Sequence, residues 1–88
     1  MKGLNYKEAD KAITNGKIIS IFWNGTNRSW YKTIYFLDNG RLCYIDVIKD
    51  KYENMTQSKI HNSAYESISN LVTIIPKNDK ASLTIENQ

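Results

Sequence analysis

The sequence predicts a small α+β domain, in which two short helices accompany an antiparallel β-sheet. Three observations lead to this prediction: a capped segment near the N-terminus, a β-branched and aromatic run directly after it, and an Asn-Gly pair between two alternating segments. The expected order is a helix, a three-stranded meander, a second short helix and a C-terminal strand. We expect the 88 residues to form one domain, spanning residues 1–88.

Residues 5–15 predict a short helix in which both ends are marked. Asn5 is a suitable N-cap, and Glu8, three residues later, completes a capping box. Gly16 supplies the left-handed residue that ends many helices. The apolar side chains of this segment share one narrow face: Ala9, Ala12 and Ile13. Such small side chains would let the helix lie close to a sheet.

A strand is expected directly after this helix, over the segment KIISIFWN. The segment is nearly continuously apolar, which favours a strand covered on both faces or covered in part by a partner chain. The next residues, NGTNRS at 24–29, have the composition of a loop.

Asn39 and Gly40 predict a type I′ hairpin turn, because both positions of this turn need positive φ. A two-residue loop fixes the register of its strands, so that Tyr35 faces Tyr44 and Phe36 faces Cys43. Side chains alternate along each strand, and the hairpin therefore has two separate faces.

The two hairpin faces differ in chemistry. One is apolar: Ile34, Phe36, Cys43, Ile45 and Val47. We expect the N-terminal helix to cover it. The other, the tyrosine face, is amphipathic: Tyr31, Thr33, Tyr35, Leu37, Leu42, Tyr44 and Asp46. The tyrosine face is either a half-buried sheet surface or a surface that binds a partner.

The C-terminal half is less regular. The polar segment before residue 62 predicts a long connection, with a short strand near residues 56–60. Ser63 and Glu66 resemble a second capping box, which predicts a helix over residues 62–71, and a strand over residues 71–76 would follow. The chain then ends in an alternating strand around residues 83–85 or in a flexible tail over about residues 78–88.

The numbers of basic and acidic residues limit the kinds of partner that the protein could bind. Twelve Lys and Arg against nine Asp and Glu give a net charge of +3, which excludes an acidic DNA mimic and permits an anionic partner. The N-terminus lacks the apolar core of a signal peptide, and no apolar run approaches the ~20 residues of a membrane span. We expect a soluble, cytoplasmic protein with no membrane partner.

The residues do not predict an enzyme. Catalysis needs converging groups, and the chain has a single cysteine, Cys43, and a single histidine, His61. Cys43 is expected to be a buried, inert thiol, and His61 to be solvated. A structural zinc site would need about four ligands, and no Gly-rich phosphate loop is present. We therefore expect no catalytic residues, no metal and no cofactor.

A cluster of binding-type residues surrounds the loop in FWNGTNRSWY: Trp23, Asn24, Arg28, Trp30 and Tyr31. Trp and Arg in loops are typical of binding hot spots. They also suit a nucleotide, since a base stacks on an indole, Arg binds a phosphate and Asn binds a polar edge. In the alternative interpretation, both tryptophans cap the ends of the core. Tyr35 and Tyr44 of the adjoining face complete the predicted binding surface.

The segment NYKEADKAITNGKIISIFWNG resembles the opening of small phage proteins of the Thoeris anti-defence 2 family. That opening is a helix with an aromatic-x-x-Ala pattern, a Gly-Lys turn, a β-branched strand and Trp-Asn-Gly. The matching residues are Tyr6, Ala9, Gly16, Lys17, Ile19, Trp23, Asn24 and Gly25. The resemblance covers about 20 of the 88 residues. It implies a protein that binds a cyclic nucleotide immune signal between subunits and performs no chemistry.

We therefore predict a non-enzymatic, phage-type counter-defence inhibitor that acts by stoichiometric binding in the host cytoplasm. It either occludes a host immune effector protein, such as a CRISPR nuclease, or sequesters a nucleotide immune signal as a homodimer. The alternative is a small module that binds single-stranded nucleic acid, with Tyr31, Tyr35 and Tyr44 as a stacking platform. Against this alternative, Lys32 and Arg41 are expected to point to the other face.

Overall fold

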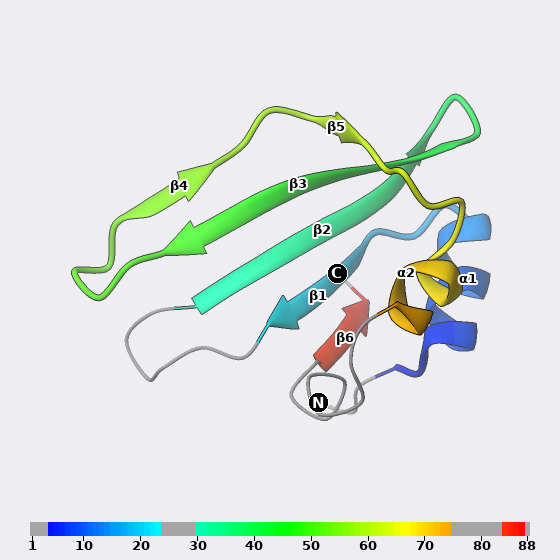
Figure 1. Ribbon diagram of the computed structural model, residues 1–88, viewed down its shortest axis with the longest axis horizontal. Helices are drawn as coiled ribbons and strands as arrows, with labels where there is room; N and C mark the ends of the chain where they lie inside the picture. Colours follow the sequence, from blue (N-terminus) through cyan, green and yellow to red (C-terminus); the bar gives the residue numbers. More distant parts are fainter. Residues whose placement is uncertain (1–3, 24–29, 75–83, 88) are drawn as a thin grey trace.

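The computed structural model describes residues 4–23, 30–74 and 84–87, and these residues form the predicted small α+β domain (Figure 1). Its helices are α1 (Tyr6–Thr14) and α2 (Ile68–Thr73). Its strands are β1 (Ile19–Trp23), β2 (Trp30–Asp38), β3 (Arg41–Lys49), β4 (Met55–Gln57), β5 (His61–Asn62) and β6 (Thr84–Asn87). Figure 1 shows the two helices side by side at one end of the sheet.

The sheet is the predicted antiparallel meander, extended at both edges. The strand order is β4-β3-β2-β1-β6, and β5 also pairs with β3. The strand alternative for the C-terminal end is correct for residues 84–87, which pair with β1 as β6. Residues 78–83, where a flexible tail was the other alternative, lie outside the described residues. The two short strands β4 and β5 belong to the segment that the sequence predicts as a long connection.

Helix α1 has the predicted capping box. The side chain of Asn5 accepts a hydrogen bond from the Glu8 amide at 2.8 Å, and the Glu8 carboxylate accepts one from the Asn5 amide at 3.1 Å. Gly16 follows the helix with a φ of +82°, in the left-handed region. Ala9 and Ile13 are buried, so the small-residue face is the one that packs inward.

The prediction for the second helix is wrong at both ends. α2 begins at Ile68, with Ser67 as N-cap, and it includes residues 71–73, which the sequence predicts as a strand. Ser63 accepts a hydrogen bond from the Tyr65 amide at 3.0 Å, a local turn that replaces the expected capping box. The helix starts later because Asp10 of α1 accepts hydrogen bonds from the amides of Ile68, at 2.7 Å, and Ser69, at 3.1 Å. A carboxylate from another helix thus satisfies amides that a helix start leaves free.

The hairpin between β2 and β3 confirms the predicted turn. Asn39 has a φ of +52° and Gly40 one of +77°, and the register pairs Tyr35 with Tyr44 and Phe36 with Cys43. The two predicted faces are therefore real.

The prediction about which face the helix covers is wrong, because both helices pack on the tyrosine face. β1 pairs with β2 so that Ile19 lies opposite Tyr35 and Ile21 opposite Thr33. The isoleucines therefore share a face with the tyrosines, and the core forms there: Ala9, Ile13, Ile19, Ile21, Tyr35, Leu42, Ile68, Val72 and Ile85. The sequence did not indicate which face the helices cover, because β1 is almost continuously apolar and either of its faces could have been the inner one.

The opposite side of the sheet, which we call the open face, carries the apolar residues expected in the core. Ile34, Phe36 and Ile45 are partly exposed, whereas Cys43 and Val47 are buried beside β5 and β4. Within the described ranges, both helices lie on the other side. Neither of these helices is long and apolar enough to cross a membrane.

Candidate ligand-binding pocket on the tyrosine face

A cavity of about 240 Å³ lies between the tyrosine face and the segment that leads into α2. We call it the tyrosine pocket. Its sheet side is lined by Trp23, Tyr31, Thr33, Tyr35, Tyr44 and Asp46. Its opposite wall is formed by Ser63, Ala64, Tyr65 and Leu71. The helices thus do not cover the tyrosine face evenly, and a hollow remains beside α2.

The structure brings together four of the seven residues that the sequence predicts for binding. Trp23, Tyr31, Tyr35 and Tyr44 all line the tyrosine pocket. Trp30 does not, because it pairs with Lys49 on the open face and its ring lies against Phe22 at 6.1 Å. The two others, Asn24 and Arg28, lie outside the described residues.

The polar groups of the pocket converge on one carboxylate oxygen. The Tyr31 hydroxyl donates to Asp46 Oδ1 at 2.8 Å, and the Thr33 hydroxyl donates to the same atom at 3.0 Å. The indole N–H of Trp23 donates in turn to Thr33 Oγ1 at 3.0 Å. This network satisfies the buried hydroxyl of Thr33, which would otherwise destabilise the sheet by about 1–3 kcal/mol.

The second oxygen of Asp46 remains able to accept a hydrogen bond. Among the residues that the structure describes, no hydrogen bond of the protein ends on Asp46 Oδ2. The Asp46 amide donates to Ser58 Oγ at 3.0 Å, which fixes this stretch of β3. The lining of the pocket therefore includes a carboxylate that is fixed by hydrogen bonds on one oxygen.

Burial keeps the phenols of the pocket in their neutral form. Burial raises the pKa of Tyr35 well above its usual value. Burial also raises the pKa of Tyr31, with Asp46 acting in the same direction and the hydrogen bond with Thr33 in the opposite one. Both hydroxyls are therefore able to donate at neutral pH, and Asp46 is the acidic residue of the lining.

Aromatic rings bound the pocket on the sheet side. Trp23 and Tyr31 are stacked with ring centroids 6.1 Å apart, and Tyr35 and Tyr44 lie 5.8 Å apart with tilted planes. His61, which the sequence predicts to be solvated, is partly exposed and stacks on Tyr44 at 5.2 Å. The pocket is therefore an aromatic recess whose lining includes one carboxyl side chain, that of Asp46.

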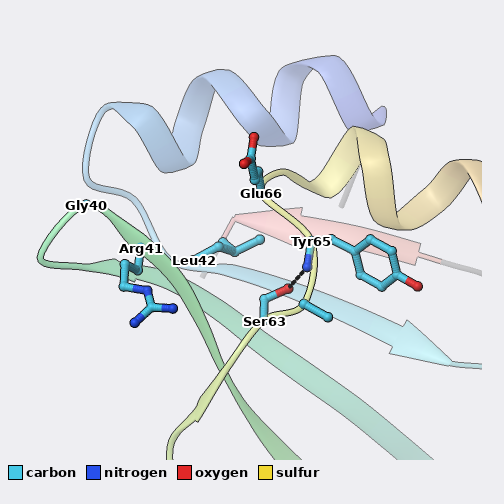
Figure 2. A pocket seen from close by; sticks show the side chains of 7 residues that line it. Gly40, Arg41, Leu42, Ser63, Tyr65 and Glu66 are labelled. Carbon is cyan, nitrogen blue, oxygen red and sulfur yellow. Dashed lines mark hydrogen bonds between the residues drawn. The ribbon is translucent and has the colours of Figure 1, made fainter.

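A second cavity, of about 480 Å³, adjoins the β2–β3 turn (Figure 2). We call it the hairpin pocket; it is lined by Gly40, Arg41, Leu42, Ser63, Ala64, Tyr65 and Glu66. Figure 2 shows Arg41 on the hairpin side and Glu66 toward α1. Ser63, Ala64 and Tyr65 line both cavities, so the two pockets share one wall.

Sequence reasoning missed the six other residues that line the pocket: Thr33, Asp46, Ser63, Ala64, Tyr65 and Leu71. A signal for Thr33 and Asp46 was present, because the hairpin register places a threonine opposite an acid on an otherwise apolar and aromatic face. No comparable signal existed for Tyr65, since its approach to the sheet depends on where α2 begins.

The site offers no evident metal chemistry: across residues 4–23, 30–74 and 84–87, no three His, Cys, Asp or Glu side chains gather in a way that could hold an ion. Cys43 is buried, with its sulfur 3.5 Å from Asn62 Oδ1. The arrangement suits the binding of a flat, donor-bearing ligand.

No protein-family model, curated protein or solved structure matches the chain, so its function has to be argued from these residues.

Proposed function

We propose that the protein is a non-enzymatic, phage-type counter-defence protein that sequesters a nucleotide immune signal in the host cytoplasm, with the base of the nucleotide in the tyrosine pocket. The resemblance of the N-terminal segment to the anti-defence family suggests the class of ligand. One structural observation supports the site: Asp46 accepts hydrogen bonds from two hydroxyl donors on one oxygen and lines the same cavity as the aromatic rings.

The chemistry of the pocket favours a base with adjacent N–H donors. Proteins recognise unpaired bases by stacking them on aromatic side chains and by hydrogen bonds to the Watson–Crick edge. The Watson–Crick edge of guanine presents two neighbouring N–H donors, and Oδ2 of Asp46 has two lone pairs that can accept from them. Adenine presents a ring nitrogen acceptor beside its amino group, and this acceptor would face the carboxylate unfavourably. We therefore propose guanine as the base.

The size of the cavity limits what enters it. Its volume of about 240 Å³ lies below the ~300 Å³ at which pockets for drug-sized ligands begin. The pocket thus suits one ring system, and the ribose and phosphates of a nucleotide would have to lie outside it. Phosphates also belong outside because Asp46 repels them. The hairpin pocket across the shared wall contains Arg41, a suitable phosphate partner.

The same geometry disfavours a protein-occluding interface or a flat stacking platform on the tyrosine face. Tyr35 is 5% exposed and Thr33 is 2% exposed. Neither can contribute much area to a partner protein or to an extended single strand. A nucleobase in the recess would reach the same residues without moving α2.

The test is a titration with guanosine, adenosine and cytidine monophosphates and with a cyclic guanine dinucleotide. A Trp30→Phe background leaves Trp23, in the pocket, as the fluorescent reporter. We expect guanine nucleotides to change Trp23 fluorescence, and Asp46→Asn to weaken their binding at least about tenfold, because a hydrogen bond to a charged group contributes about 1.5–3 kcal/mol.

The matched control is Asp38→Asn, the same chemical change at an exposed position of the β2–β3 hairpin. It should leave nucleotide binding unchanged. Absence of binding by every nucleotide at millimolar concentration, or equal affinity of Asp46→Asn and wild type, would contradict the proposal. Thermal melts of both variants check that the fold is intact.

A further inference from the structure

The open face carries a compact group of aromatic and basic side chains that the tyrosine pocket does not use. Phe22 and Trp30 meet edge to face with ring centroids 6.1 Å apart. The Lys32 ammonium lies over both rings, 5.5 Å from the Phe22 centroid and 5.4 Å from that of Trp30. Lys49 is the cross-strand partner of Trp30. We call these four residues the basic aromatic cluster; all are partly exposed.

The cluster continues into an apolar surface along the same strands. Ile34 and Phe36 follow Lys32 at alternate positions of β2, and Ile45 lies opposite Ile34 on β3. Residues on one face of a strand recur about every 7 Å. The open face therefore carries a row of apolar and aromatic side chains. This row begins beside Lys32 and Lys49.

We propose that the open face binds single-stranded nucleic acid, with bases stacked on Trp30 and Phe22 and phosphates paired with Lys32 and Lys49. Base–aromatic stacking contributes about 1–3 kcal/mol per base and tolerates any sequence. This binding goes beyond the proposed function, since it uses the opposite side of the sheet and a polymeric ligand.

The distribution of charge supports this ligand. Asp46 lies on the covered side of the sheet, whereas the cluster contains two lysines and no acid. The Glu53 carboxylate lies 3.9 Å from the Lys49 ammonium, but Glu53 is 74% exposed and such a surface pair is weak. A polyanion would therefore meet a positive edge beside the aromatic rings, and the net charge of +3 would favour its approach.

A second copy of the chain fits this face less well. A symmetric dimer whose two-fold axis passes through the basic aromatic cluster would bring Lys32 and Lys49 close to their equivalents in a desolvated interface. Like charges in that position cost binding energy, whereas phosphates would neutralise them. Repulsion between the lysines therefore favours a nucleic acid over a second copy of the chain on the open face.

The test is the fluorescence anisotropy of labelled oligothymidine and oligouridine with the full chain at several salt concentrations. Each phosphate neutralised on a single strand contributes about −0.7 to the slope of log K against log salt, so two lysines predict a slope of about −1.4. Lys32→Gln should reduce the slope by about 0.7. Trp30→Ala should weaken binding about tenfold or more, and Trp30→Phe, which keeps an aromatic ring, should restore most of the affinity.

An exposed pair elsewhere in the protein supplies matched controls. The Lys51 ammonium lies 5.2 Å from the Tyr52 ring centroid, in the turn between β3 and β4. Lys51→Gln and Tyr52→Ala make the same chemical changes outside the basic aromatic cluster, in the turn that follows Lys49, and should alter oligonucleotide binding much less than Lys32→Gln and Trp30→Ala. Asp46→Asn should not weaken oligonucleotide binding, so failure of the nucleotide proposal is distinguishable from failure of this one.

Three results would overturn the inference. One is the absence of oligonucleotide binding at low salt, and another is an equal loss of affinity in the Lys51 and Tyr52 variants. The third is a dimer in sedimentation experiments that Trp30→Ala or Ile34→Asp dissociates, because the open face would then be occupied by a second copy. Thermal melting of Trp30→Phe shows whether the fold tolerates a change at this position.

Discussion

The face of the sheet that the helices cover and the face that they leave open are built from alternate residues of the same strands. On β2, the covered side holds Thr33 and Tyr35, which are 2% and 5% exposed. The open side of the same strand holds Ile34 and Phe36, which remain partly exposed. The side with more hydroxyl groups is thus the more deeply buried one. Apolar content within a hairpin does not by itself decide which face becomes the inner one.

The difference arises from the neighbours of the hairpin. Ile19, Ile21 and Ile85 share the covered face with the tyrosines and supply the apolar surface that the helices need. The hydroxyl groups of Tyr31 and Thr33 are then satisfied within the protein, through Asp46 and the indole of Trp23. Once the polar groups are paired, burial of the rings stabilises the fold.

The difference between the covered face and the open face is tested most strongly by replacing one isoleucine on each face with alanine. Ile21 is fully buried, so Ile21→Ala should lower the free energy of unfolding by about 2–5 kcal/mol. Ile45→Ala on the open face should cost about 1 kcal/mol, because the side chain already meets water. Urea denaturation of both variants measures the difference. Equal losses would mean that the open face is also covered in solution.

A second prediction concerns the carboxylate that fastens α2 over the covered face. Asp10→Ala removes the acceptor for the amides of Ile68 and Ser69 and should cost about 2 kcal/mol of unfolding free energy. Ser69→Ala removes one hydroxyl donor of the same cap and should cost less than about 1 kcal/mol. Thermal or urea unfolding compares the two. A neutral Asp10→Ala would show that packing alone positions α2.

The turn that separates the two faces is tested by a change at Gly40. Its φ of +77° suits glycine, and no atom lies within 4 Å of where a Cβ would stand, so the cost of a substitution is conformational. Gly40→Val should destabilise the domain by about 1–3 kcal/mol, because a β-branched residue is strained at positive φ. Asn39→Gly should change stability by only a few tenths of a kcal/mol. An unchanged melting temperature for Gly40→Val would argue against this turn.

The smallest expected change in the free energy of unfolding occurs at alkaline pH and arises from Tyr35 on the covered face. Burial raises the pKa of Tyr35, so the folded state favours the neutral phenol. That contribution is fully present below the unfolded value of about 10 and is lost as pH rises above it. Urea unfolding at pH 8 to 11 should show this loss in the wild type, with no tyrosine-linked change below about pH 9. Tyr35→Phe keeps the ring and should lose less stability over the same range.

The candidate site could be anticipated in part. The density of aromatic residues marked Trp23, Tyr31, Tyr35 and Tyr44, and these four residues meet in one pocket. The wall formed by Tyr65 could not be anticipated, because it depends on the late start of α2. Trp30 has the same residue type as Trp23 but lies on the opposite face, because Trp23 pairs with Tyr31, and Trp30 directly precedes Tyr31 on a strand whose successive side chains point to opposite faces.

Local interactions explain what the sequence alone determined: the capping box of α1, the Asn-Gly turn, and the hairpin register that follows from it. Each depends on residues a few positions apart, so the residue types suffice to specify it. Only the tertiary structure decided which face of the sheet the helices cover, where α2 begins, and which polar groups meet in the pocket. These outcomes depend on contacts between distant segments, such as Asp10 with Ile68 and Ile19 with Tyr35. Burial on one face required the polar groups of that face to find partners, and those partners come from other strands and helices.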